Sequence, residues 1–263
     1  MTNKEYHNRL EISNSDLLLI KKSPYYFKNK DKFKQNTDAF TFGSALHTLV
    51  LEPKNFDKEY IVHDFNKRKK EDKQKYQEIL NNDIKILNTK EYDILKKMSD
   101  KILNDDICKQ FLCDGVPEES YFSKLEGVKV KCRPDYFNKK NKTIIDLKTT
   151  IDASLNGFVL SASKFNYHIQ ASFYIDLMNS LDYDIQNFLF IAIEKTEPFS
   201  IGLHQYDKVS LDRGREQYKQ LLDIYKWCEK NNNFYEYKNL DLQNNKITHI
   251  NTMTLPTYKF YEN

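Results

Sequence analysis

The stretch 127–150, GVKVKCRPDYFNKKNKTIIDLKTT, constrains the fold of this chain more than any other. Apolar and polar residues alternate over 128–132, which is typical of a strand, and the apolar run 143–145 indicates a second strand. Between them lies a polar segment, 138–142, which is rich in lysine and asparagine. The pattern therefore predicts a β-hairpin that turns within this polar segment.

Charged residues fall at matching positions of the predicted hairpin. A turn centred near Lys140 places Asp135 across from Asp146, and cross-strand Cβ atoms lie roughly 5 Å apart. Because side chains alternate along a strand, Asp146 and Lys148 share one face, while Leu147 points into the opposite layer. We therefore expect two carboxylates and one ammonium group to converge.

This group of side chains suits a divalent metal ion. Hard cations such as Mg²⁺ prefer oxygen ligands, and two nearby carboxylates supply them. A bound metal lowers the pKa of a coordinated water and offsets charge that develops on a phosphate. Lys148 would hold that water or help to deprotonate it. The alternative is a surface hairpin whose Asp and Lys side chains are solvated or paired with one another.

Length and composition limit the class of protein. The 263 residues allow one large domain or a core with an appended lobe. A hydrophobic fraction of 40% predicts a folded protein, and 30% charged residues with 6 glycines indicate much helix. A net charge of +3 neither requires nor excludes nucleic acid. There is no leading apolar segment and no long apolar run, so we expect a cytoplasmic protein without a membrane partner.

The cysteines lack the paired C-x-x-C spacing of a zinc ribbon. We expect reduced thiols, and the alternative is a four-cysteine iron–sulfur cluster. The residues are Cys108, Cys113, Cys132 and Cys228.

Two of the helices predicted before the hairpin bear on the site or on the packing of the sheet. Residues 40–51, FTFGSALHTLVL, are almost all apolar, Gly43 would allow another backbone to approach closely, and His47 lies one turn further on. A histidine on an apolar helix is usually a core residue with one hydrogen bond, and the alternative is a ligand. Periodic apolar positions predict a second helix over 89–112, broken near Asn104.

Further strands are predicted on either side of the hairpin. Residues 119–122 form the expected first strand of the sheet, from which Glu118 or Glu119 would face the metal site unless it is solvated. Residues 187–194 and 199–206 are apolar segments joined by a short turn, which predicts an antiparallel hairpin.

The predicted helix that begins at 167 carries two polar residues of interest. Gln170 and Tyr174 are four residues apart, so they face the same side and could reach one ligand. The alternative is an ordinary amphipathic face. A later helix over 211–230 is expected to cover one face of the sheet.

Four motifs, in this order, resemble the PD-(D/E)XK nuclease superfamily. They are Gly43-Ser-Ala-Leu-His47, Arg133-Pro134-Asp135, Asp146-Leu147-Lys148-Thr149-Thr150 and Gln170-x-x-x-Tyr174. Within the superfamily the chain is most similar to the exonuclease VIII (RecE-type) family, over most of residues 5–230. The resemblance implies an α/β fold with a restriction-endonuclease-like central mixed sheet flanked by helices.

The resemblance also implies roles by position. Asp135 and Asp146 match the metal-binding acids of the family. The carbonyl of Leu147 is expected to complete the ligand set. Lys148 matches the catalytic lysine, and His47 matches a histidine that contacts a metal.

Other family positions carry over in the same way. The family places a glutamate on the preceding strand, for which we choose Glu119, with Glu118 as the alternative because the loop before Gly127 is shortened here. Gln170 and Tyr174 match a motif near the scissile phosphate and the DNA end.

The function implied by the resemblance is a Mg²⁺- or Mn²⁺-dependent exodeoxyribonuclease with two ions. It would degrade duplex DNA from its ends, 5′ to 3′, and leave 3′ single strands for a single-strand annealing protein in recombination. A ring-shaped homo-oligomer, a trimer or tetramer, is expected. The alternatives are a structure-directed or restriction-like endonuclease and a non-catalytic DNA-end-binding module.

Three parts of the chain are expected within one structural domain. Residues 1–115 would form a mainly helical part that carries the metal-site histidine. Residues 116–230 would form the nuclease core, and residues 231–263 a C-terminal tail.

Overall fold

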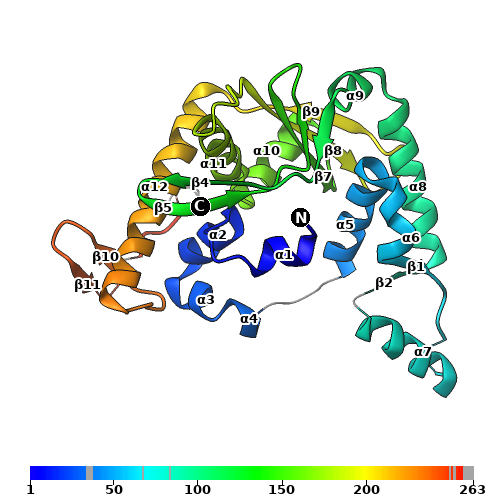
Figure 1. Ribbon diagram of the computed structural model, residues 1–263, viewed down its shortest axis with the longest axis horizontal. Helices are drawn as coiled ribbons and strands as arrows, with labels where there is room; N and C mark the ends of the chain where they lie inside the picture. The colour runs from blue at the N-terminus through cyan, green and yellow to red at the C-terminus, as the bar shows by residue number, and fades with distance from the viewer. Residues whose placement is uncertain (34–37, 67, 83, 249, 251–252, 257–263) are drawn as a thin grey trace, which may run out of the picture.

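The computed structural model describes residues 1–33, 38–66, 68–82, 84–248, 250 and 253–256. A central sheet runs through the molecule with helices on both of its faces (Figure 1). The predicted α/β fold with a central mixed sheet flanked by helices is therefore confirmed. Part of the predicted C-terminal tail, 249, 251–252 and 257–263, lies outside the described residues.

The central sheet has five strands in the order β3-β6-β7-β8-β9. Only the β7–β8 pair is parallel, and the other three pairs are antiparallel. The predicted hairpin of the last two strands is confirmed by the β8–β9 pairing. The bounds are β3 Gly115–Pro117, β6 Tyr136–Asn138, β7 Thr143–Thr150, β8 Asn187–Glu194 and β9 Ile201–His204.

The predicted hairpin around 138–142 is present, but its first strand is shorter than expected. Strand β6 pairs with β7, with Phe137 opposite Ile144. Strand β5, Val128–Cys132, leaves this sheet and pairs instead with β4, Tyr121–Leu125. The chain bends between β5 and β6 at Pro134, a residue that cannot donate a ladder hydrogen bond.

The strand predicted over 119–122 also needs correction. It begins at Tyr121, and it lies in the separate β4–β5 pair rather than in the central sheet. The edge strand of the central sheet is β3, which pairs with β6.

Each face of the sheet packs on its own set of helices (Figure 1). On one face, Ile145 and Leu147 of β7 share a core with α5, Asp38–Leu51, and α8, Thr89–Asn104. On the other, Ile144 of β7 shares a core with α10, Leu155–Lys164, α11, Tyr167–Asn179, and α12, Lys208–Asn231. Helix α12 packs chiefly on α11, so it covers the sheet less directly than predicted. The alternation along β7 therefore decides which helices each side chain meets.

Most helices lie near their predicted positions. The long helix ends at Asn104 as predicted, because Asp105 caps a new helix and accepts hydrogen bonds from the backbone N–H groups of Ile107 and Cys108. The larger helices are α5 Asp38–Leu51, α7 Lys70–Asn81, α8 Thr89–Asn104, α10 Leu155–Lys164, α11 Tyr167–Asn179 and α12 Lys208–Asn231.

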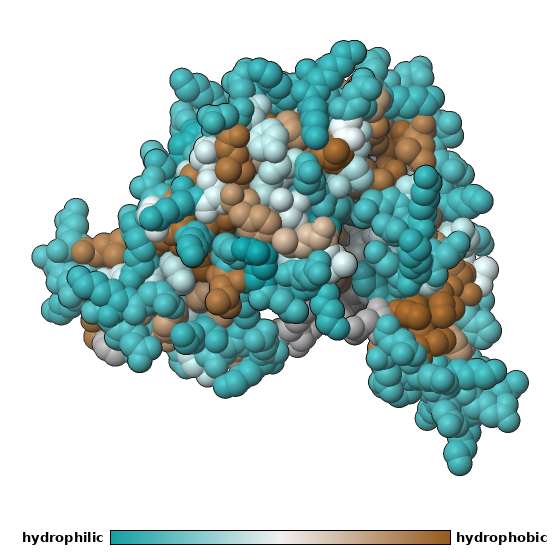
Figure 2. All heavy atoms as spheres, in the orientation of Figure 1, coloured by the Kyte–Doolittle hydropathy of each residue, from teal (hydrophilic) through white to brown (hydrophobic). Residues whose placement is uncertain are grey.

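Shorter elements complete the chain. The helices are α1 Asn3–Asn8, α2 Asn14–Lys22, α3 Pro24–Lys28, α4 Lys30–Phe33, the 3-10 turn Pro53–Asn55, α6 Phe56–Glu59 and α9 Asp106–Phe111. The strands are β1 Tyr60–Val62, β2 Lys85–Leu87, β10 Asn239–Asp241 and β11 Lys246–Thr248. Helix α7 projects from the body, and its surface is hydrophilic (Figure 2).

The N-terminal segment is anchored to strand β5 by a buried lysine. The ammonium group of Lys131 donates hydrogen bonds to the carbonyl oxygens of Tyr6 and Arg9, both at 2.8 Å. The backbone N–H of Ile12 donates to the Lys129 carbonyl at 3.0 Å. These bonds fix α1 beside strand β5.

Gly43 does not have the packing role predicted for it. A Cβ atom at this position would meet no described heavy atom within 4 Å.

Within the described residues, no helix has the length and apolar character needed to cross a bilayer.

Candidate metal and catalytic site

Three potential metal ligands converge from three separate elements. His47 comes from α5, Glu118 follows β3, and Asp135 precedes β6. One ligand atom from each lies within 4.8 Å of the other two. A nitrogen and carboxylate oxygens at this spacing suit a divalent cation. We call these three residues the ligand cluster.

His47 connects helix α5 to the central sheet. Its Nε2 lies 2.7 Å from the carbonyl oxygen of Leu147, and its Nδ1 lies 3.4 Å from Asp135 Oδ2. Burial lowers the pKa of His47, but the attraction to the Asp135 carboxylate outweighs it and raises the pKa to about 9. A histidine between a carboxylate and a carbonyl is therefore held in its protonated form until a metal replaces the proton.

Asp135 lies beside β7, as the predicted register requires. Its Oδ2 accepts a hydrogen bond of 2.7 Å from the backbone N–H of Leu147. Burial raises the pKa of Asp135, but the charges of His47 and Lys148 and the bond from Leu147 lower it overall. Leu147 thus uses its N–H to orient one potential ligand and its carbonyl oxygen to orient another.

The structure places Glu118, not our choice Glu119, in the ligand cluster. The backbone of Glu118 is left-handed, with φ of +47°, and its N–H donates to the Asp135 carbonyl at 3.1 Å. Burial and then the Asp135 charge raise the pKa of Glu118 to about 8. Glu119 instead accepts a hydrogen bond of 2.5 Å from the Tyr121 hydroxyl. A sequence rarely shows which residue has a positive φ, so it gave no reason to choose Glu118 over Glu119.

Asp146 and Lys148 form a buried ion pair on the opposite face of β7 from Leu147. The ammonium nitrogen of Lys148 lies 2.5 Å from Asp146 Oδ2, and the Asp146 side chain is 1% exposed. Gln170 on α11 donates a hydrogen bond of 2.6 Å to Asp146 Oδ1. Burial lowers the pKa of Lys148, but the Asp146 charge raises it above its usual range.

Tyr174 does not reach this ion pair in the way that Gln170 does. Its ring packs edge-on against Phe188, at 6.2 Å between centroids, and it lies partly buried against the hydrophobic core. Residues four positions apart lie on the same side of a helix, which is the basis of the prediction. The ring of Tyr174 nevertheless packs against neighbouring phenylalanines.

Sequence reasoning assigned no role to two residues that touch the site. Arg133 donates from Nε to the Glu118 carbonyl oxygen at 2.7 Å, and the same nitrogen lies 3.2 Å from Glu118 Oε2. The ring of Tyr167 lies under the Lys148 ammonium, 4.8 Å from it. Arg133 was visible in the Arg-Pro-Asp motif, whereas nothing in the sequence distinguished Tyr167 from other tyrosines.

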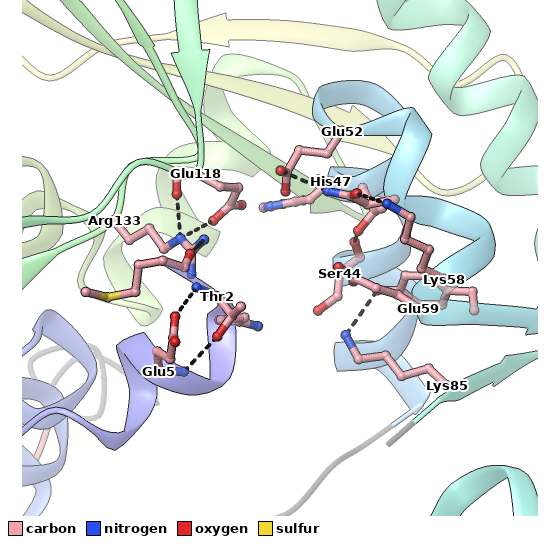
Figure 3. Close-up of a pocket in the computed structure, with 15 residues that line it drawn as sticks. Thr2, Glu5, Ser44, His47, Glu52, Lys58, Glu59, Lys85, Glu118 and Arg133 are labelled. Carbon is pink, nitrogen blue, oxygen red and sulfur yellow. Dashed lines mark hydrogen bonds and ion pairs between the residues drawn. The ribbon is translucent and has the colours of Figure 1, made fainter. Parts of the chain in front are cut away.

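A cleft of about 510 Å³ opens onto the ligand cluster. Glu118 and Arg133 lie on the wall next to α1, and His47 lies on the opposite wall (Figure 3). Lys58 and Lys85 stand further along the wall of His47 (Figure 3). Solvent, a metal ion or an extended substrate can therefore reach the cluster from this side.

A family model described as "PDDEXK-like domain of unknown function (DUF3799)" matches residues 13–238. No curated protein matches the chain in sequence.

Two solved structures are similar to the chain. One is named "Putative exonuclease" from Eubacterium rectale; it is 14% identical, the alignment covers 93% of this chain and 97% of that one, and the TM-score is 0.63. Another is a phage related exonuclease from Haemophilus somnus 129PT; it is 15% identical, with 88% and 100% covered and a TM-score of 0.36. The first similarity shows a shared fold.

Proposed function

The chain belongs to the PDDEXK-like family DUF3799, and from this premise we propose that it is a divalent-metal-dependent exodeoxyribonuclease acting on duplex DNA ends. One observation carries the proposal: the ligand cluster lies directly beside the Asp146–Lys148 ion pair, with Leu147 bonded to both His47 and Asp135. A purely structural ion pair would not require a second group of acids at its side.

The residues present fit a divalent cation. His47, Glu118 and Asp135 would hold it, with the Leu147 carbonyl oxygen as a further ligand. Asp146 would join them, and we propose two ions, Mg²⁺ or Mn²⁺. Such ions, when bound, would polarise the phosphate and lower the pKa of a nearby water, so that the water can lose a proton and attack the phosphorus.

The chain's own residues would perform the remaining tasks. Lys148 keeps its ammonium group at Asp146, where it can hold the attacking water by a hydrogen bond and donate a proton. Gln170 fixes the other oxygen of Asp146, and Tyr167 limits the movement of Lys148. Arg133 positions Glu118, and its buried Nη1 has no hydrogen-bond partner among the described residues.

Several finer properties belong to this proposal. We propose digestion from 5′ to 3′, which leaves 3′ single strands for a single-strand annealing protein, and a ring-shaped homo-oligomer. The four ordered motifs resembling the RecE-type family support these points.

End-labelled duplex DNA in Mg²⁺ provides the test. We expect the parent to release label from linear duplex and to spare closed circular duplex. Lys148→Ala should lower the rate about 10²- to 10⁴-fold, the usual contribution of a positioned acid–base group, and Asp135→Asn should also be inactive. Lys140→Ala, which removes an exposed lysine from the turn of the same hairpin, is the matched control.

The possible contrary results separate the rival functions. Nicking of closed circles would identify an endonuclease. Tight binding of DNA ends without hydrolysis in Mg²⁺ or Mn²⁺ would identify a binding module. Full activity of Lys148→Ala would show that the site has been assigned to the wrong residues.

A further inference from the structure

Phe165 exposes half of its side-chain surface at the junction of α10 and α11. The residue is 50% exposed, although it is a large apolar side chain. The next residue, Asn166, has a left-handed backbone with φ of +57°, a conformation that asparagine tolerates better than most residues. The turn stacks the rings of Phe165 and Tyr167, with 5.8 Å between centroids and 21° between planes.

The stacked pair leads directly to the catalytic lysine. Tyr167 lies against Phe190 of β8, at 5.6 Å and 22°, which fixes its ring on the sheet. The Lys148 ammonium lies 4.8 Å from the centroid of the same ring. Phe165 therefore extends, into solvent, a row of rings that begins beside the proposed reaction centre.

The surroundings of Phe165 suit a polyanion with flat apolar parts. The sequence has no Asp or Glu between Asp152 and Asp176, and the Lys164 ammonium lies 5.7 Å from the Phe165 ring. Apolar side chains that are unusually exposed precede it in the chain: Ile151 at 91%, Leu155 at 67%, Val159 at 52% and Leu160 at 75%. Exposed apolar side chains gathered in one segment mark binding surfaces.

We propose that Phe165 stacks on a base of the DNA strand being cleaved, next to the scissile phosphate, while Lys164 pairs with a flanking phosphate. The inference rests on the proposed nuclease function and names a further substrate-binding residue for it. An unpaired base at a DNA end can stack on Phe165 and so continue the row of rings. Every base has a flat face, so this stacking requires no particular sequence. Lys164 is long and flexible enough to move off the ring when the base arrives.

Fluorescence anisotropy can measure this contact without turnover. The probe is a short duplex labelled away from the bound end, with Ca²⁺ replacing Mg²⁺. Phe165→Ala should weaken binding about 5- to 100-fold, the usual effect of losing one base–aromatic stack. Phe165→Trp should retain affinity because it keeps a ring. Tyr237→Ala is the control, since Tyr237 is 61% exposed but lines a separate groove between α2 and α12.

An abasic site placed in turn at each nucleotide near the end shows which base is stacked. At one position the parent should lose affinity, and Phe165→Ala should lose nothing further, because the stack is already absent. Equal losses from Phe165→Ala on every abasic duplex would overturn the inference, and so would unchanged binding by this variant. If the parent itself neither binds nor cleaves DNA ends, the proposed function fails and the inference fails with it. A parent that binds and cleaves with no role for Phe165 leaves the proposed function intact.

Discussion

At the scale of single residues, protons and metal ions compete for the same atoms. Attraction to Asp135 raises the pKa of His47 to about 9 despite burial, and burial together with Asp135 raises the pKa of Glu118 to about 8. Both groups are therefore protonated at pH 7 when no metal is bound. A metal ligand must lose its proton, so binding is linked to pH.

We predict that metal affinity rises with pH between about 6 and 9. Below the two pKa values the free protein carries protons that the metal-bound protein lacks, so acid favours the free form. Titration calorimetry with Mn²⁺ at pH 7, in buffers of different ionisation enthalpy, should show release of about two protons per ion. Binding without proton release, or affinity that falls as the pH rises, would contradict this assignment of ligands.

The sequence predicted residue positions wherever alternation along a strand decides them. Asp135 opposite β7 and the shared face of Asp146 and Lys148 follow from a period of two. The choice between Glu118 and Glu119 depends on a left-handed backbone, which the pattern does not encode. The contact of Tyr167 with Lys148 depends on how α11 packs on the sheet, and no local pattern contains that information.

At the scale of elements, the site depends on close packing of α11 against α12. Gly214 of α12 lies so near to α11 that a Cβ atom would overlap the His168 carbonyl oxygen and the Ser172 hydroxyl. Arg215 also binds Asp176 through two nitrogens, at 2.6 and 2.8 Å. Helix α11 carries Gln170, so a displaced α11 would release its bond to Asp146.

We predict that Gly214→Ala destabilises the protein by about 1–3 kcal/mol, the usual cost of overpacking, and lowers activity. Gly43→Ala is the control, since a Cβ there would meet no described heavy atom within 4 Å. It should be neutral or stabilise by about 0.5–1 kcal/mol, because alanine favours helix more than glycine does. Urea unfolding measures the free energy of unfolding of both variants. A Gly214→Ala protein as stable as the parent would refute the packing argument.

Elements were predictable where the local pattern is strong. Strand β8 and the break before α9 match their predicted bounds, because a continuous apolar run and a capping residue mark them. The pairing of β5 with β4 was not predictable in the same way. The sequence is compatible with pairing of β5 to either β4 or β7. It does not show that the chain leaves the ladder at Pro134.

At the scale of the whole molecule, the proposed reaction centre lies where the two helical layers meet the sheet. Helix α5 supplies His47 from one face, and α11 supplies Gln170 from the other. One core contains residues of both 1–115 and 116–230, including Leu46, Leu95 and Ile191. This packing supports our proposal that these parts form one structural domain. Neither layer alone could complete the centre.

A Mn²⁺ soak of crystals of the parent tests the central claim most directly, because anomalous scattering locates the metal without relying on activity. We predict a peak bonded to His47, Glu118, Asp135 and the Leu147 carbonyl oxygen. The peak should disappear in Asp135→Asn crystals. Manganese bound only elsewhere, with the His47–Leu147 hydrogen bond still intact, would contradict the account.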